Sequence, residues 1–401
     1  MKESVSTTHR WRLMLDTLRH EARSVASSPA IVLVMVGGVV LYGLLYNILY
    51  RPNVVREAPV VVVDHSHTPL SRHLVESVDA TPQVAVVAEA GDIGQARGLM
   101  AQGKAEGTII IPHDLERRIG LGEEALFVVA ASTAEFLYYE AIQSGTLGAL
   151  QAIDHELAPQ VAATLLPTDR LLAVAQAKPV EVVGTPLFNP TKGYGKYLLP
   201  AVLIVIICQT MLMVVCLRTD GEGKRFKNSL LCGQRPPRIS LGDTLAVVVG
   251  RGALYTFLYA LFSLFLLGML PHLFGLPHLA RWQDLFVLGA LLLPANALFA
   301  LCFASLFRDG DGALLVVTFF SLGLLLLGGI SYPLEFMPTP WVVLHHLLPA
   351  PVGILAYVKM NSMGASLGEC APQLLTLALQ ILAYLLLALA LTHHRLNKQS
   401  R

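Results

Sequence analysis

Residues 98–105 read GLMAQGKA, and the spacing G-x-x-x-x-G-K is typical of loops that bind nucleotide phosphates. Such a loop follows a strand, opens a helix, and places a Ser or Thr after the lysine to hold Mg²⁺. Here residues 92–104 read as a helix, a strand is expected after them, and Ala105 occupies the hydroxyl position. We therefore predict a helix that ends at Gly103, with Lys104 at the negative end of its dipole, rather than a nucleotide site.

The stretch DHSH places His65 and His67 two residues apart, with His73 nearby. Alternate residues of an extended strand share a face, so two imidazoles there could bind one metal ion. No Cys, His or Glu at a recognisable spacing completes the site, and the five cysteines contain no C-x-x-C pair. We predict polar loop residues and no metal. We recognise no nucleophile elbow or triad, and we assign no catalytic residue.

The composition indicates the class of protein that contains these residues. The chain has 401 residues, of which 54% are hydrophobic and 14% charged, whereas soluble domains carry about 25% charged residues. Its net charge of +1 gives no sign of a nucleic-acid partner. A bilayer core of about 30 Å needs roughly 20 apolar helical residues. Six stretches meet this need, at residues 30–50, 198–217, 252–270, 285–307, 312–330 and 371–391.

The placement of lysine and arginine orients these six predicted spans. Basic residues concentrate in residues 1–28, in the loop 218–242 and in the C-terminal tail, so the positive-inside rule places all three in the cytoplasm and residues 51–190 outside. Residues 1–28 read as a basic amphipathic helix at the membrane surface, before the first span at 29–50; a soluble helix packed on a partner is the alternative. The apolar face of this helix carries Trp11, Leu15, Leu18, Ala22 and Val25.

Residues 51–190 alternate between short apolar runs and helix-like stretches. The longest helix is expected from about Ala134 to Leu166. Because strands that alternate with helices favour a parallel sheet, we predict an extracytoplasmic α/β domain. It is inserted into a polytopic α-helical membrane protein of six transmembrane helices, five of them within residues 191–401. The strands are expected at 60–64, 83–89, 107–112 and 125–131, with a last one at 179–186.

The loop 218–242 combines large apolar and basic side chains. A solvated basic loop would not need such apolar residues, so we predict that this loop docks onto a partner; a loop lying on the membrane surface is the alternative. The residues concerned are Phe226, Leu230 and Leu231, flanked by Arg225, Lys227 and Arg235.

Prolines interrupt the apolar segment 333–350. Pro333, Pro338, Pro340 and Pro349 prevent one continuous spanning helix. We predict a re-entrant hairpin that dips into the outer leaflet and returns. Within it, Glu335 could act as a functional acid, contact a lipid headgroup or cap a helix.

Three longer stretches carry a resemblance to a known family: VVVVDHSHTPLSRHL (60–74), LFNPTKGYGKYLLPAVLI (187–204) and SYPLEFMPTPWVVLHHLLPAPVGILAY (331–357). Together they resemble the permease subunits of ATP-binding-cassette exporters of the type-2 class, in the branch with a large external domain between the first two spans. The second stretch is similar to that family's entry into the second span, at Asn189 and Pro190. The third is similar to its signature, at Pro333, Glu335, Met337 and Pro338.

The resemblance implies a permease that exports a small or amphipathic substrate from the cytoplasm or the inner membrane. A coupling helix in the loop 218–242 would dock onto separate cytoplasmic ABC ATPase subunits. Those subunits would bind ATP and Mg²⁺, so this chain would carry no cofactor and no ATPase activity. Further implied partners are a second permease copy or a paralogue, a periplasmic membrane-fusion adaptor and an outer-membrane channel, around a multi-pass chain in the bilayer of the bacterial inner membrane.

Other functions stay open on the residues alone. A membrane-anchored receptor or sensor could bind a ligand with its α/β domain, although one span would suffice for that purpose. A membrane-embedded enzyme would need catalytic residues, which are not recognised. A secondary transporter coupled to ions usually needs ionisable groups within the membrane, and no Asp or Glu lies centrally in the six stretches.

Overall fold

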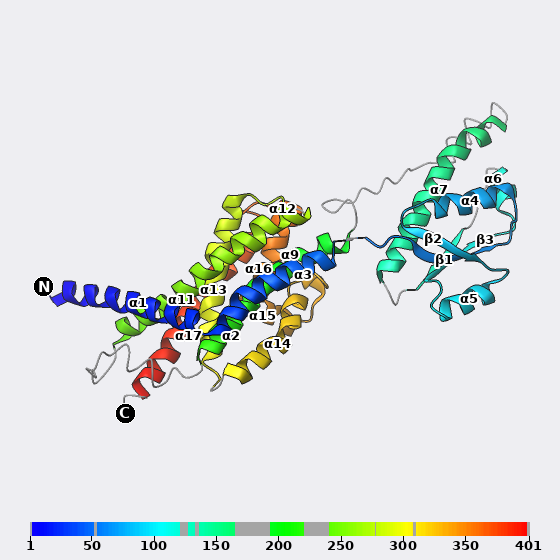
Figure 1. Ribbon diagram of the computed structural model, residues 1–401. Coiled ribbons are helices and arrows are strands. Elements are labelled where there is room, and N and C mark those ends of the chain that lie inside the picture. Colours follow the sequence, from blue (N-terminus) through cyan, green and yellow to red (C-terminus); the bar gives the residue numbers. More distant parts are fainter. Residues whose placement is uncertain are drawn as a thin grey trace. The chain divides into compact units, whose positions relative to one another are not determined.

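The computed structural model describes residues 2–51, 54–120, 127–132, 136–164, 193–219, 240–276, 278–307 and 310–398. The chain forms two compact units (Figure 1). Residues 1–51 and 195–401 form what we call the helical unit, and residues 52–194 form the mixed unit.

The mixed unit contains a four-stranded sheet in the order β2-β1-β3-β4. The central strand β1 is parallel to both β2 and β3, and β4 closes the edge antiparallel to β3. Each strand overlaps one expected from the sequence; the strand expected at 179–186 lies outside the described residues. The bounds are β1 Ala58–Asp64, β2 Val84–Glu89, β3 Gly107–Ile111 and β4 Val128–Ala131.

Helices cover both faces of this sheet. Val60 and Val62 of β1 pack under the helices α4 (Pro69–Asp79), α6 (Leu115–Gly120) and α7 (Phe136–Thr164). Val61 and Val63 face the opposite side, where α5 (Ile93–Ala101) packs. All four valines are at most 1% exposed, which explains why β1 reads as an uninterrupted apolar run rather than as an alternation.

The motif GLMAQGKA forms the end of helix α5. Gly103 has a φ of +69°, and its N–H donates to the carbonyl of Met100. The N–H of Lys104 donates to the carbonyl of Leu99. This pair of bonds is a Schellman motif, in which a left-handed glycine satisfies the last carbonyls of a helix. The predicted helix end at Gly103 is therefore confirmed.

Among the described residues of the helical unit, five helical segments are long and apolar enough to cross a membrane. Two of them contain a π-helical turn: α2 (Pro29–Val32) continues through η1 (Leu33–Gly38) into α3 (Val39–Leu49), and α11 (Leu241–Ser263) continues through η2 (Leu264–Met269) into α12 (Leu270–Phe274). The other three are α9 (Tyr194–Thr219), α13 (Trp282–Ala304) and α17 (Ala371–Lys398). Helix α1 (Lys2–Ser27) precedes the first of the five.

The sixth candidate span differs from the expected one. At the predicted span 312–330 the structure has α14 (Gly310–Leu326), whose 17 residues reach about 25 Å, short of a bilayer core of about 30 Å. The sixth candidate is instead a bent pair, α15 (Thr339–Leu347) and α16 (Pro349–Met363), which meet at 89°. Most of α16 is buried. Only its first two residues fall within the hairpin predicted at 333–350, and no helix was predicted over the rest of it.

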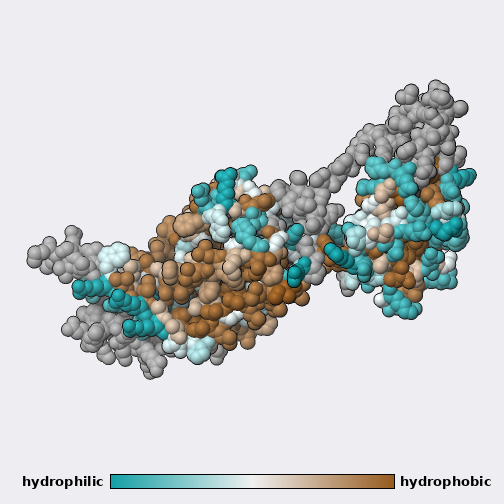
Figure 2. Space-filling model, turned by 45° about the horizontal axis from the view of Figure 1, so that its top comes forward, coloured by the Kyte–Doolittle hydropathy of each residue, from teal (hydrophilic) through white to brown (hydrophobic). Residues whose placement is uncertain are grey.

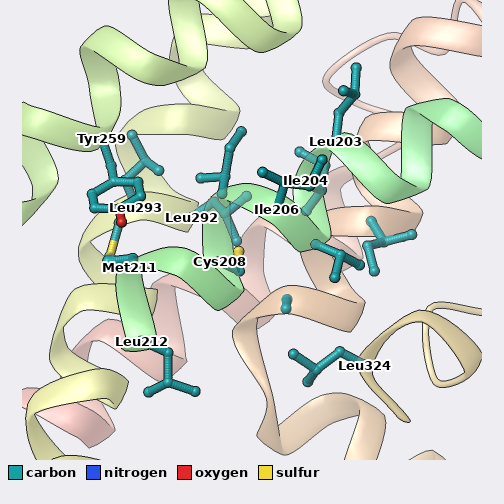
Figure 3. Close-up of a cluster of buried hydrophobic side chains, with 14 of the residues drawn as sticks. Leu203, Ile204, Ile206, Cys208, Met211, Leu212, Tyr259, Leu292, Leu293 and Leu324 are labelled. Atoms are coloured by element: carbon teal, nitrogen blue, oxygen red, sulfur yellow. The ribbon is translucent and has the colours of Figure 1, made fainter. Parts of the chain in front are cut away.

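Helix α9 lies at the centre of the helical unit. Leu203, Cys208 and Met211 of α9 pack among Tyr259 of α11, Leu292 and Leu293 of α13, and Leu324 of α14 (Figure 3). Outside this core, large apolar side chains stay exposed, including Phe257, Phe286 and Phe319 at 63%, 77% and 80%. Figure 2 shows a broad brown, hydrophobic surface over the helices, as a chain embedded in lipid requires.

Candidate functional site

The loop that was expected to dock an ATPase lies outside the described residues. Arg225, Phe226, Lys227, Leu230, Leu231 and Arg235 fall within 220–239, and Asn189 and Pro190 within 165–192. Their roles stay predictions. The structure does describe the two helix ends that border the loop. Helix α9 ends at Thr219, and α11 begins after Ser240, whose Oγ accepts the N–H groups of Gly242 and Asp243 at 3.2 and 3.4 Å.

A buried carboxylate ties these two helices to α1. Glu21 of α1 is fully buried at 0% exposure. Its Oε1 accepts the hydroxyl of Tyr255 at 2.7 Å and lies 3.3 Å from Nη2 of Arg251, both on α11. Its Oε2 lies 3.5 Å from Nη2 of Arg218, in the last turn of α9. We call these four residues, Glu21, Arg218, Arg251 and Tyr255, the Glu21 cluster.

Glu21 is ionised at neutral pH. Burial by itself raises the pKa of this carboxyl, but the charges of Arg251 and Arg218 and the hydroxyl of Tyr255 outweigh burial. They hold the pKa below its ordinary value. The side chains of both arginines are nearly buried, at 10% and 13% exposure, so the three charges interact with little screening by solvent.

Acid is expected to remove the stabilisation that the Glu21 carboxylate provides. Its folded-state pKa is lowered from an unfolded value of about 4.3, so its contribution is complete above that value and is lost as the pH falls through the folded-state pKa. The melting temperatures of the wild type and Glu21→Gln should therefore differ most near neutral pH and converge below about pH 4. Thermal unfolding in detergent across this range measures the difference, and a constant difference contradicts the assignment.

Close backbone contact also holds α1 on α11. A Cβ on Gly250 would stand 2.9 Å from the carbonyl oxygen of Met14, so only glycine admits the α1 backbone at this distance. Nearby, Nε of Arg10 lies 3.9 Å from Asp243. The face of α1 that packs inward carries Thr17, Glu21 and Val25, whereas Trp11 and Leu15 of the expected apolar face are 61% and 45% exposed.

Of the four signature residues, Pro333, Glu335 and Pro338 are exposed and Met337 is half-buried. They surround a short 3-10 turn, η3 (Leu334–Phe336), that leads into α15. The bend between α15 and α16 is compatible with a broken span and with a re-entrant loop, so the re-entrant hairpin at 333–350 stays a prediction.

Side chains supply the hydrogen bonds that the backbone loses at this bend. The extended backbone of Leu348 interrupts the helix, and Pro351 cannot donate to the carbonyl of Leu347, so the carbonyls of His346 and Leu347 lack their usual helical donors. The Gln380 amide donates to the carbonyl of His346 at 2.7 Å, and the Tyr384 hydroxyl donates to that of Leu347, both from α17.

Side chains also donate hydrogen bonds to backbone carbonyls of the segment between α14 and α15. Nδ1 of His345, which is 1% exposed, donates to the carbonyl of Leu327 at 2.7 Å. The hydroxyl of Tyr197 in α9 donates to the carbonyl of Ile330. Non-helical backbone at membrane depth requires such partners, because no water is present to replace them.

In the mixed unit, Asp64 ends β1 and organises the turn into α4. One carboxylate oxygen accepts the N–H groups of Ser66 and His67, and the other accepts the hydroxyl of Ser71 at 2.6 Å. The DHSH stretch therefore forms a strand-to-helix turn, in which His67 adopts a φ of +51°. Within the described part of the chain, no group of three His, Cys, Asp or Glu side chains could hold a metal ion.

One serine pattern escaped the sequence analysis. Residues 364–368 read GASLG, which has the G-x-S-x-G spacing of a nucleophile elbow. An elbow requires a strand before it, whereas Gly364 is the left-handed cap of helix α16. Oγ of Ser366 donates to Oε2 of Glu369 at 2.7 Å. This serine therefore belongs to a turn between two helices, without the strand that would expose it as a nucleophile.

Comparison with known families assigns this architecture. The sequence model described as ABC-2 family transporter protein matches residues 29–390, which is most of the chain. The chain belongs to the ABC-2 transporter family. No curated protein sequence matches it. As an ABC-2 permease it is a multi-pass membrane component of a transporter, and its family implies an ABC ATPase as partner. The matched range begins at the first candidate span. It includes Arg218, Arg251 and Tyr255 of the Glu21 cluster, whereas Glu21 itself precedes it.

Proposed function

We propose that this chain is the membrane subunit of an exporter driven by separate cytoplasmic ABC ATPase subunits. Its cargo is a small or amphipathic molecule that leaves the cytoplasm or the inner membrane. The family match over residues 29–390 carries this proposal. The five candidate spans in the described part of the chain support it, because a membrane-anchored receptor would need only one.

In the proposed mechanism, ATP closes the two ATPase subunits and pushes on the loop 218–242. The contact residues are Arg225, Phe226, Lys227, Leu230, Leu231 and Arg235. The push enters the membrane through α9 and α11, which border the loop. Because α9 packs against α11, α13 and α14 in one core, a displacement of its end is passed to several spans at once. The spans then change from inward to outward access.

The proposed arrangement places both termini and the loop 218–242 in the cytoplasm of a bacterium. The mixed unit lies outside the inner membrane, where it guides substrate or contacts a membrane-fusion adaptor that leads to an outer-membrane channel. A second copy of the chain or a paralogue completes the pore. ATP and Mg²⁺ bind to the ATPase and not to this chain. The segment 333–350 dips into the outer leaflet, with Glu335 at headgroup level.

Capture of the ATPase tests this proposal. The full-length tagged chain is expected to co-purify an ABC ATPase from its native membrane. Leu230→Glu is expected to lower that capture about tenfold, since a charge in an apolar contact leaves an unpaired group buried. Ile93→Glu is the matched control: Ile93 is 54% exposed at the start of α5 in the mixed unit, where an acid suits the helix dipole.

Two results would overturn the proposal. The first is a wild-type chain that captures no ATPase. The second is purified chain that, reconstituted alone in liposomes, moves a fluorescent amphipathic dye in response to a proton gradient without ATP. Equal capture by the wild type and Leu230→Glu would instead move the contact away from Leu230 and leave the class of transporter intact.

A further inference from the structure

The Glu21 cluster joins three helices at one carboxylate. Each oxygen serves a different helix: Oε1 contacts Arg251 and Tyr255 of α11, and Oε2 contacts Arg218 of α9. Glu21 itself belongs to α1, so no two of the three helices can separate at this point without breaking a charged contact. Apolar side chains could fill the same space, but they would not fix the distance between specific atoms.

The position of the cluster along the chain matters as much as its geometry. Arg218 lies in the last turn of α9, directly before residues 220–239. Helix α11 begins after that segment, at Leu241, and Arg251 follows within its amino-terminal half. The same carboxylate therefore fixes the end of the helix that enters the loop and the beginning of the helix that leaves it.

We infer that Glu21 is a positioning residue for energy coupling. It sets the spacing between the two helix ends that border residues 220–239, and binding of the ATPase depends on this spacing. It also makes α1 move together with α9 and α11 when the ATPase pushes on the loop 218–242. This inference rests on the proposed function, which supplies the ATPase but assigns no role to Glu21.

Other contacts keep α1 in place when the cluster is altered, which makes the inference testable. The approach of the Met14 backbone to Gly250 does not depend on any of the charges. In Arg218→Gln, Glu21 loses its contact to α9 and keeps Arg251 and Tyr255 of α11 as partners. In this variant α1 is expected to stay packed on α11, while the distance between α9 and α11 is no longer fixed by Glu21.

The experiment titrates purified permease in nanodiscs with the ATPase that co-purifies with the wild type, and records melting temperature separately. Arg218→Gln is expected to bind the ATPase about tenfold more weakly with a melting temperature near that of the wild type. Arg218→Lys keeps the charge and should restore most of the affinity. Arg10→Gln removes the other pair between α1 and α11; since Arg10 is 47% exposed, affinity should stay within about twofold.

A second variant separates positioning from stability. Replacing Glu21, Arg218 and Arg251 together by Met removes the three charges that meet at this carboxylate, and apolar replacement of a buried ion cluster often preserves stability. We expect the melting temperature of this triple variant to lie near that of the wild type, while its affinity for the ATPase is about tenfold lower than that of the wild type.

The outcomes are distinct. If Arg218→Gln, or the triple Met variant when it folds, binds the ATPase as tightly as the wild type, the inference is overturned and the proposed function stands. If the wild type itself captures no ATPase, the proposed function falls and takes this inference with it. Weak binding by both variants with retained melting temperatures supports the inference, because a purely structural role would lower affinity and stability together.

Discussion

Valine at position 250 is expected to displace α1 from the helical unit. The added Cβ would lie 2.9 Å from the carbonyl oxygen of Met14 and 3.5 Å from the Cβ of Thr17. A side-chain tip could rotate away from such a contact, but the obstacle is helical backbone, so the whole helix has to shift. That shift separates Glu21 from Arg251 and breaks a buried ion pair. Overpacking costs about 1–3 kcal/mol. Breaking a buried ion pair costs about 3–5 kcal/mol more.

The matched control for this prediction is Gly289→Val in α13. A Cβ at Gly289 meets no atom within 4 Å, so the same substitution introduces the same propensity change without the collision. Thermal unfolding in detergent measures both variants, and limited proteolysis reports whether α1 has become accessible. Similar melting temperatures for the two variants would show that the close contact between α1 and α11 contributes little to stability.

Phenylalanine at position 345 is expected to loosen the segment between α14 and α15. His345 is buried, and its ring donates to the carbonyl of Leu327, which directly follows helix α14 in the helical unit. Phenylalanine fills a similar volume but cannot donate. A buried carbonyl without a partner costs about 1–3 kcal/mol.

The neighbouring histidine supplies the control. His346 is exposed, and the contact at this residue uses its backbone carbonyl, which Gln380 binds. His346→Phe should therefore leave the melting temperature nearly unchanged, whereas His345→Phe lowers it. Hydrogen exchange of the amides from 328 to 338 provides a local measurement. Equal exchange in both variants would contradict a role for His345 in holding this segment.

Local signals explain what the sequence could predict. The end of α5 at Gly103 depends on a glycine and on bonds within six residues, so it is visible in a short window. The four strands follow from apolar runs bounded by turn residues, and the spans follow from length and hydropathy. Helix α16 was missed because Pro349 was taken as a helix breaker, although proline also suits the first turn of a helix.

Long-range partners explain what the sequence could not predict. Glu21 belongs to a helix that was predicted to lie at the membrane surface, and its partner Arg251 lies 230 residues further along the chain. Nothing near either residue indicates that the two meet. The donors at the bend are equally hidden, since Gln380 and Tyr384 read as isolated polar residues in an apolar span. The contact residues expected between Arg225 and Arg235 depend on a partner chain, so they stay predictions.

The Glu21 cluster has a consequence for how the protein is made. Glu21 leaves the ribosome early, whereas Arg251 follows 230 residues later, after the whole mixed unit has been synthesised. At about 5–20 residues per second, the carboxylate waits about 10–50 s for this arginine. During that interval the first span is inserted while α1 has no buried place to occupy. The N-terminal helix therefore docks late, and its docking reports that α9 and α11 have been inserted side by side.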